Sequence, residues 1–179
     1  TEGEVYFSDK EALVAGLNGT DIYYSFDGIS WNTPISTNST KKTIELGNNT
    51  KVYIKNETHK MNNGTRGTGI FFNKNAKIGG DLSTIVSMSE HCCDGLFYRN
   101  NFLTDASELI LPWNVVENRF FYEMFQYCTN LLYPPQLPAT ILKGACYLSM
   151  FGGCYKLTVA PELPATTLST EERKGDGTD

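Results

Sequence analysis

The sequence lacks the features of a nucleic-acid-binding or membrane-spanning protein. It has 15 Lys and Arg residues against 20 Asp and Glu, a formal net charge of -5 and a pI near 5.1. No basic stretch is longer than Lys41-Lys42, so nothing in the chain would exchange counterions with phosphates. The longest apolar runs, such as Leu109-Ile110-Leu111, fall far short of the roughly 20 residues that cross a bilayer. We therefore expect no nucleic-acid partner and no direct insertion of this segment into a membrane.

Residues for acid–base or metal chemistry are also scarce. The histidines are His59 and His91, and the chain has no Gly-x-Gly-x-x-Gly, Walker-type or Gly-x-Ser-x-Gly motif. One local cluster, His91-Cys92-Cys93-Asp94, lacks the Cys-x2-Cys interval that lets two thiolates bind one zinc ion. We favour core packing for this cluster over a disulfide, and a disulfide over catalysis or metal binding. The sequence thus predicts no enzyme, no metal and no cofactor.

Disulfides and glycosylation are left open by the sequence. The cysteine count of five is odd and cannot close completely into bridges. Cys128 and Cys154 occupy equivalent places in consecutive repeats, where a bridge is conceivable but burial as free thiols is favoured. Five Asn-X-Ser/Thr sequons would suit a eukaryotic secretory pathway, although chance is favoured because this half of the chain is crowded with such residues. They lie at Asn18, Asn38, Asn48, Asn56 and Asn63.

The most informative feature is a degenerate repeat near the end of the chain. Residues 120–145 align with residues 146–168, and ten of the nineteen positions from Met124 to Leu142 are identical. A looser third copy lies upstream: Cys92, Leu96, Phe97 and Leu103 precede Phe120, Met124, Phe125 and Leu131 by one constant offset. A period of this length, within the roughly 20–29 residues of leucine-rich repeats, predicts stacked units with a shared core. We expect one column of Phe97, Phe125 and Phe151 and another of Leu103, Leu131 and Leu157.

Each repeat divides into two parts. The stretch from Tyr147 to Phe151 has no breaker before Gly152-Gly153, which favours a single helical turn closed by glycine. Leu157-Thr158-Val159 then alternates like a strand, and the prolines that follow end it. The sequence therefore predicts one helical turn and one short strand per repeat.

The part of the chain before the repeats, residues 1–76, predicts short strands. Asp21 to Phe26 and Ile29 to Trp31 flank Asp27-Gly28, a two-residue hairpin signal. Further strands are expected at Glu4 to Ser8, Thr43 to Leu46, Val52 to Ile54 and Gly69 to Phe72, a short helix at Asp9 to Leu17, and a linker near Asn73 to Gly80. This half is predicted to be a small antiparallel sheet.

The repeat motif resembles a known family. The pattern Cys-Tyr-x-x-Met-Phe-x-x-Cys-x-x-Leu-x-x-Ala-Pro-x-Leu-Pro-Ala-Thr-x-Leu, at residues 146–168, is similar to the BspA-like leucine-rich repeats of surface proteins from gut and oral anaerobic bacteria. Residues 24–31 also look like the strand pair that often precedes those repeats. The resemblance implies export to the cell surface and a role in adhesion or protein contact, and it does not imply an enzyme. The chain departs from the pattern after Leu168, where it becomes wholly polar.

The predicted fold class is α+β, with three parts. Residues 1–76 form a small β-rich domain, residues 77–168 a short leucine-rich-repeat solenoid, and residues 169–179 a polar tail or cap. Because the chain starts at Thr1 without methionine or an apolar signal region, we expect a mature or trimmed form of a secreted or cell-surface protein. Exposed strand edges and an unfinished stack leave dimerisation open.

The predicted function is binding or adhesion, with a protein or glycan on a host or neighbouring cell as partner. The expected surface is one face of the stacked strands, at Leu132, Pro134, Gln136, Thr158, Ala160 and Glu162. The alternative is carbohydrate recognition by the aromatic residues of the first domain, Tyr24 and Trp31 above all, with Tyr23 and Tyr53 beside them. Since successive strand residues point to opposite faces, Tyr23 or Tyr24 is expected in the core.

Overall fold

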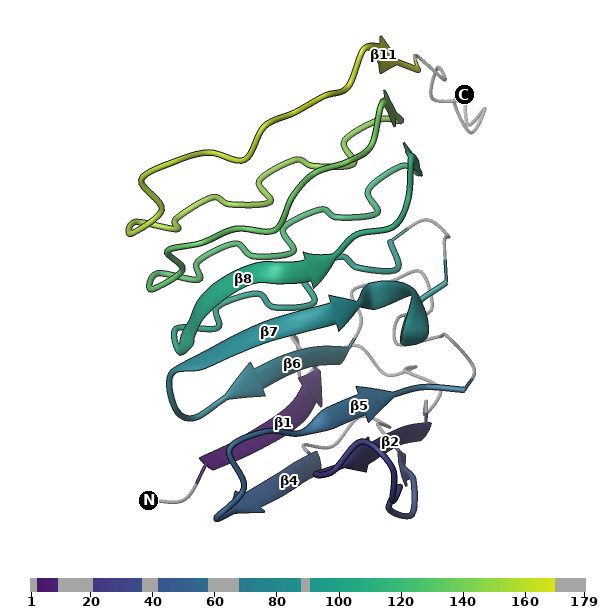
Figure 1. The fold of residues 1–179 in the computed structure, drawn as a ribbon. Helices are drawn as coiled ribbons and strands as arrows, with labels where there is room; N and C mark the ends of the chain where they lie inside the picture. The colour runs from purple at the N-terminus through teal and green to yellow at the C-terminus, as the bar shows by residue number, and fades with distance from the viewer. Residues whose placement is uncertain (1–2, 10–20, 37–41, 58–67, 88–90, 170–179) are drawn as a thin grey trace, which may run out of the picture.

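The computed structural model describes residues 3–9, 21–36, 42–57, 68–87 and 91–169. The first strands lie at one end of the molecule and the last strand lies at the other end (Figure 1). Its elements are the strands β1 (Gly3–Asp9), β2 (Asp21–Ser25), β3 (Ile35–Ser36), β4 (Lys42–Gly47), β5 (Tyr53–Lys55), β6 (Thr68–Phe72) and β7 (Ala76–Asp81), the 3-10 helix η1 (Leu82–Thr84), and the strands β8 (Leu103–Ile110), β9 (Val115–Val116), β10 (Ile141–Leu142) and β11 (Thr167–Leu168).

The first strands form two antiparallel sheets. In one, β1 lies between β4 and β6, and Val5 pairs with Ile44 and Phe72. In the other, β2 lies between β3 and β5. Val5, Ile22, Ile44 and Ile70 are buried, as expected for β-branched residues on the inner face of a sheet. The predicted strands of this half are thus confirmed at β1, β2, β4, β5 and β6.

Other expectations for this half are corrected or lie outside the described residues. The segment Ile29–Trp31 is not a strand: β2 pairs instead with β3 at Ile35–Ser36, so the connection is much longer than Asp27-Gly28. The expected linker at Asn73–Gly80 contains β7, which pairs in parallel with β8. The predicted helix at Asp9–Leu17 falls almost entirely outside the described residues.

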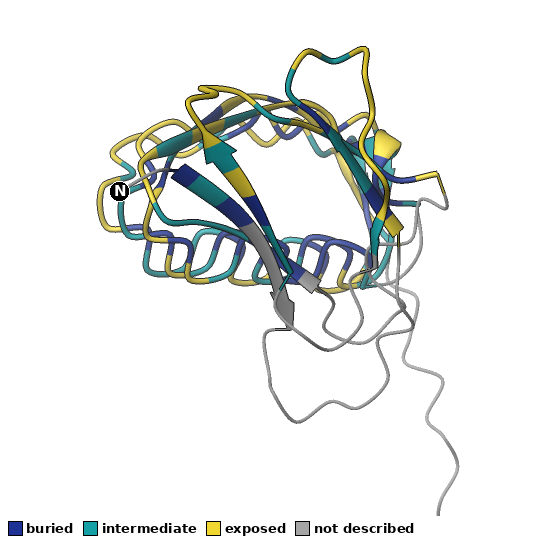
Figure 2. Cartoon of the chain, turned by 90° about the horizontal axis from the view of Figure 1, so that it is seen from below, coloured by how far each residue is buried: buried dark blue, intermediate teal, exposed yellow. Residues whose placement is uncertain are grey.

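Beyond β7 the chain forms three similar layers, which we name layer one (residues 91–116), layer two (119–142) and layer three (145–168). They end in β9, β10 and β11, which pair in parallel, with Ile141 opposite both Val115 and Thr167. Seen from the lower end, an extended side and a side of short turns face each other, and buried residues line the inside of both (Figure 2).

The side of short turns, here called the turn wall, comprises residues 91–100, 119–128 and 145–154. Its even-numbered N–H groups donate within the layer to the carbonyl three residues earlier, for example Met124 to Phe121 at 3.2 Å. Odd-numbered N–H groups donate to the next layer: Phe97 N–H to the Met124 carbonyl at 2.9 Å and Phe125 N–H to the Met150 carbonyl at 2.9 Å. Backbone hydrogen bonds from alternate residues therefore join each layer to the next.

The predicted helical turns are wrong. The described residues contain no α-helix, and every fourth residue of the turn wall has a positive φ, including Glu123 at 52° and Ser149 at 57°. A right-handed helix cannot include such a residue without strain. It would also direct its N–H groups along its own axis and leave none for a neighbouring layer. The predicted strand at Leu157–Val159 is wrong as well, because the strand of layer three is β11, after the prolines. The predicted α+β class with a leucine-rich-repeat solenoid is therefore overturned: the described chain consists of strands, turns and irregular segments.

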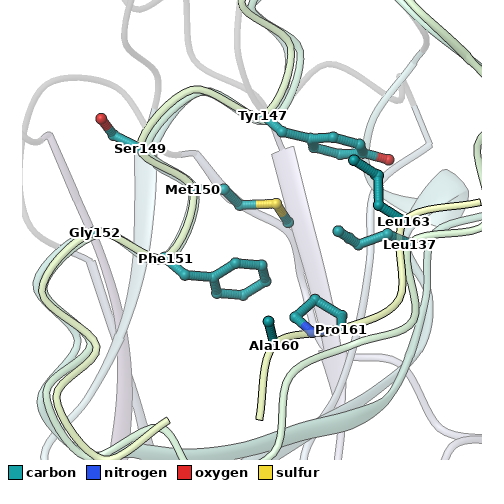
Figure 3. A pocket seen from close by; sticks show the side chains of 9 residues that line it. All are labelled: Leu137, Tyr147, Ser149, Met150, Phe151, Gly152, Ala160, Pro161 and Leu163. Carbon is teal, nitrogen blue, oxygen red and sulfur yellow. The ribbon is translucent and has the colours of Figure 1, made fainter. Parts of the chain in front are cut away.

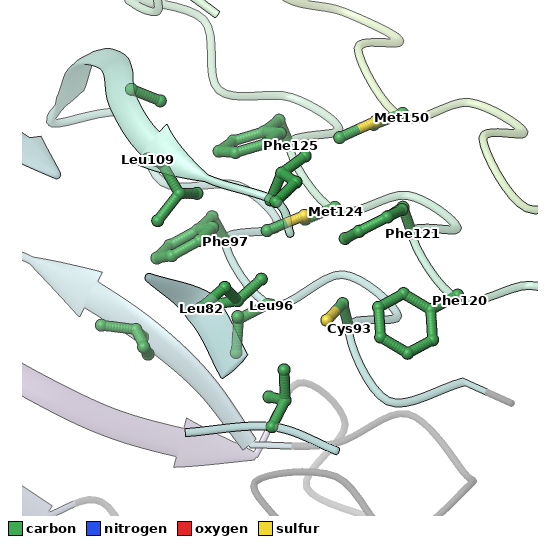
Figure 4. Packing of buried hydrophobic residues seen from close by; sticks show 14 of the residues in the cluster. Leu82, Cys93, Leu96, Phe97, Leu109, Phe120, Phe121, Met124, Phe125 and Met150 are labelled. Carbon is green, nitrogen blue, oxygen red and sulfur yellow. The ribbon is translucent and has the colours of Figure 1, made fainter. Parts of the chain in front are cut away.

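The expected phenylalanine column is confirmed. Phe97 and Phe125 stack with ring centroids 5.3 Å apart, and Phe125 and Phe151 with centroids 5.5 Å apart. Leu103 and Leu131 are buried beside them, while Leu157 in layer three is half-buried. One cluster of buried side chains runs from Val5 in β1 to Cys154 in layer three, and Figure 4 shows its middle part.

Candidate functional site

The residues predicted from strand alternation lie mostly on the surface of layers two and three. Leu132, Gln136, Thr158, Ala160 and Glu162 are exposed, and Pro134 is half-buried. Between them, Leu131, Pro135, Leu137 and Ala139 turn inward. The structure thus places five of these six predicted residues outside the core, on the outer surface of the extended side of the two layers. Ala160 is the exception: it is exposed at the open end of layer three, beside Phe151 and Pro161, and does not belong to this surface. We call this surface, with the outward residues of β7 and β8, the strand face.

Two exposed apolar residues of the strand face were missed in the sequence. Tyr133 is 57% exposed, and it forms a parallel bridge with Asp105 in β8. Val159, 72% exposed, has the place in layer three that Tyr133 has in layer two, just as Phe151 corresponds to Phe125. Strict alternation from Leu131 would turn Tyr133 inward. The signal against it was Pro134-Pro135, because two prolines that cannot donate to a ladder interrupt the regular pleat.

Charged residues border Tyr133 on the side of β7. Lys77 Nζ lies 3.1 Å from Asp105 Oδ2. The pKa of Asp105 is lowered because the Ser107 hydroxyl and backbone N–H donate to its carboxylate, with Lys77 adding to the effect. The hydrogen bond and charge of Asp105 raise the pKa of Lys77 in turn. The strand face therefore has an apolar centre at Tyr133 and Val159 and a charged margin at β7 and β8.

The aromatic residues of the first sheets do not form one open platform. Tyr24 is half-buried and packs against the core, with its ring 5.6 Å from Phe26. Tyr23 pairs with Lys55 on the neighbouring strand. The Lys55 ammonium lies 4.4 Å from the Trp31 ring centroid and 5.4 Å from that of Tyr23. Tyr24 thus packs against the core, whereas Trp31 and Tyr23 each have the Lys55 ammonium close to the ring.

The cysteine cluster is buried in the core. His91 Nδ1 lies 3.2 Å from Asp94 Oδ2, while Cys92 and Cys93 are fully buried. The pKa of the Cys93 thiol is raised well above its ordinary value, mainly by burial and further by the neighbouring Cys92 and Asp94. A thiol that holds its proton is a poor nucleophile and a poor metal ligand. No group of three or more His, Cys, Asp or Glu side chains among the described residues is placed to hold a metal ion.

All five cysteines are free and buried thiols. Cys128 Sγ donates to the Phe97 carbonyl at 2.9 Å, and Cys154 Sγ donates to the Phe125 carbonyl at 3.1 Å. Each thiol therefore forms a hydrogen bond with a carbonyl of the preceding layer, which explains why the repeat has a cysteine at this place. Burial raises the pKa of both thiols, that of Cys154 to about 11.

The sequons have different surroundings. Asn48 is exposed. Asn56 is buried, and its Nδ2 donates to the Ile85 carbonyl at 3.2 Å, so a glycan on that nitrogen would disrupt the fold. Asn18, Asn38 and Asn63 lie outside the described residues.

None of the helices in the described part of the chain has the length and apolarity to span a membrane. In comparisons with known proteins, no protein family, no curated protein and no solved structure matches this chain.

Proposed function

We propose that the chain is a binding module of a secreted or cell-surface protein, and that its strand face contacts a protein on a host or neighbouring cell. The observation that carries the proposal is the exposure of Tyr133 and Val159 at equivalent places of adjacent layers. An exposed Leu132 lies beside Tyr133. Apolar groups gathered on a rigid surface are typical of protein interaction sites.

The arrangement of the strand face suits a protein partner. Tyrosine is enriched among the residues that dominate binding energy, because its ring gives a large contact area and its hydroxyl a hydrogen bond. Gln136 and Glu162 are exposed on the same two layers, and the Lys77–Asp105 ion pair lies at the margin. An apolar centre with a polar rim is the usual composition of an interface. The resemblance of residues 146–168 to BspA-like surface proteins supports the same role.

Cell binding tests this proposal directly. The labelled chain would be added to cultured epithelial cells and to bacterial cells, and bound label measured by flow cytometry. We expect saturable binding to at least one cell type, and a loss of roughly tenfold or more in affinity for the Tyr133→Ser/Val159→Ser double variant. Because both side chains are exposed, the variant should unfold at the same temperature as the parent chain.

A matched control distinguishes a specific surface from general stickiness. Ile29 is also an exposed apolar residue, 82% exposed, but lies in the connection after β2. Ile29→Ser should bind like the parent chain. Binding to neither cell type, or equal losses in the Ile29 and the double variant, would refute the role of the strand face.

The alternative, carbohydrate recognition through Tyr24 and Trp31, has less support. A sugar ring stacked on Trp31 would have to displace the Lys55 ammonium, and Tyr24 packs against the core. Among the described aromatic residues, Trp31 and Tyr53 remain exposed on the first sheets.

A further inference from the structure

The stack of layers ends in an open apolar hollow. A cavity of about 390 Å³ lies over layer three (Figure 3), and its lining includes Leu137, Tyr147, Met150, Phe151, Pro161 and Leu163. Apart from Leu137, which belongs to layer two, these residues all come from the last layer. The hollow is therefore the end of the interior that the layers share.

Side chains that are buried in layer two are exposed at their equivalent places in layer three. Leu137 is 7% exposed and Leu163 is 55% exposed; Leu142 is 6% exposed and Leu168 is 75% exposed. The members of each pair are identical residues at the same place of adjacent repeats. The difference between them is the presence of a layer above, so the open end has the chemistry of an uncovered core.

The turn wall of layer three also has a row of backbone donors. In layer two, the N–H groups of Glu123, Phe125 and Tyr127 donate to carbonyls of layer three at 3.1, 2.9 and 2.7 Å. The equivalent N–H groups of layer three belong to Ser149, Phe151 and Gly153. None of these three has an acceptor among the described residues. They fall on alternate residues, as the donors below them do.

A side chain at the same end has an unused hydroxyl. Tyr147 stacks on Phe121 with ring centroids 5.6 Å apart, and its buried hydroxyl has no hydrogen-bond partner among the described residues. Burial raises the pKa of this hydroxyl, so it keeps its proton and remains a donor. A buried donor without a partner is costly, and a rearrangement of this end that gives the hydroxyl an acceptor would remove the cost.

We propose that the open end of layer three is a docking site for a polypeptide segment with the same repeat pattern as residues 119–142, bound as a further layer. Layer one is covered by layer two, and layer two is covered by layer three, through the same pattern of contacts. The structure therefore contains two examples of a repeat segment that covers such an end. A segment of this pattern presents carbonyls at every second residue, as Met124 and Gln126 do to layer one. Its apolar side chains would fill the hollow.

A second copy of the chain fits this end less well. Two turn walls placed face to face would set N–H donors against N–H donors. At the opposite end of the layers, the Leu96 carbonyl already accepts from Ile70 N–H in β6 at 2.9 Å. A copy docked head to tail would thus meet an acceptor that is already used. The proposal does not depend on the strand face, so each can fail without the other.

Titration with a synthetic peptide of residues 118–142 tests the proposal on the full chain. We expect a saturable rise in the fluorescence anisotropy of the labelled peptide. We also expect hydrogen exchange to slow by about tenfold or more at the amides of Ser149, Phe151 and Gly153. Protection at these amides shows that the peptide covers layer three and does not replace layer two.

Two controls make the test specific. A peptide with Met124 and Phe125 replaced by serine lacks the side chains that enter the hollow and should not bind. In the chain, Leu163→Asp places a charge at an exposed position of the lining, so folding should be unaffected and affinity should fall roughly tenfold or more.

The proposal is overturned by any of four results. These are no binding up to the solubility limit of the peptide, equal binding of the serine peptide, and amides of Ser149, Phe151 and Gly153 that are already protected in the chain alone. The fourth is self-association in analytical ultracentrifugation that Leu163→Asp abolishes, which would identify a second copy as the occupant.

Discussion

Replacing Phe125 by alanine probes the shared interior at its most crowded point. Phe125 is fully buried, and its ring stacks between Phe97 at 5.3 Å and Phe151 at 5.5 Å. Burying a phenylalanine contributes roughly 1.5–3 kcal/mol, and each stacked aromatic pair adds about 0.5–1.5 kcal/mol. The cavity left behind adds to the loss, so Phe125→Ala should lower the free energy of unfolding by about 3–5 kcal/mol.

Phe151→Ala provides the matched comparison. Phe151 has the same place in the last layer, but it is half-buried and has one stacked neighbour in the column, Phe125. Its truncation should cost roughly half as much, about 2 kcal/mol. Urea unfolding followed by circular dichroism measures both, with unchanged m-values as the sign that the comparison is valid. A loss below about 1 kcal/mol for Phe125→Ala, or equal losses at the two positions, would refute the stacked interior.

Three further predictions concern pH, backbone conformation and sugars. Burial raises the pKa of Cys154 from 9.0 to about 11, so the unfolded chain loses this proton first. The contribution of Cys154 to the free energy of unfolding should therefore be constant below pH 9 and be lost as the pH rises to about 11; in urea titrations the fall over this range should be smaller for Cys154→Ala. In thermal unfolding, Gly153→Ala should lower the melting temperature more than Gly47→Ala does. Both glycines have a positive φ, but an added Cβ at Gly153 would lie 2.5 Å from the Tyr127 ring, whereas at Gly47 it meets nothing within 4 Å. Equal decreases would contradict the packing of the turn wall. Trp31→Ala should leave a glycan-array profile unchanged, and a specific signal lost in this variant would favour carbohydrate recognition.

The columns of the interior could be predicted because they depend on period alone. Phe97, Phe125 and Phe151 recur at the same place of successive repeats, and equivalent residues of stacked units must lie above one another whatever the local conformation. The local conformation of the turn wall could not be predicted in the same way. Apolar residues at Met150, Phe151 and Cys154 fit the spacing of a helix as well as that of turns that recur at every fourth residue. The choice between helix and turns depends on the carbonyls of the next layer that accept hydrogen bonds from the turn wall. The sequence pattern does not show these contacts.

The strand face was predicted in outline and missed at its centre. Alternation correctly placed Leu132 and Gln136 on the surface, but Tyr133 was overlooked because the prolines after it break the alternation. Likewise, the linker expected near Asn73 to Gly80 instead contains β7, which includes Gly79 and Gly80 and is paired with β8. At Gly79 an added Cβ would lie 2.9 Å from the Glu108 side chain, so close approach of the two strands explains this glycine.

The central claim is that alternate N–H groups of the turn wall join one layer to the next, and scalar couplings across hydrogen bonds test it most directly. A long-range HNCO spectrum of the isotopically labelled chain should correlate the Phe97 amide nitrogen with the Met124 carbonyl carbon, and the Phe125 amide nitrogen with that of Met150. Correlations from the Phe125 amide to the Phe121 carbonyl carbon would instead show an α-helix and contradict the account.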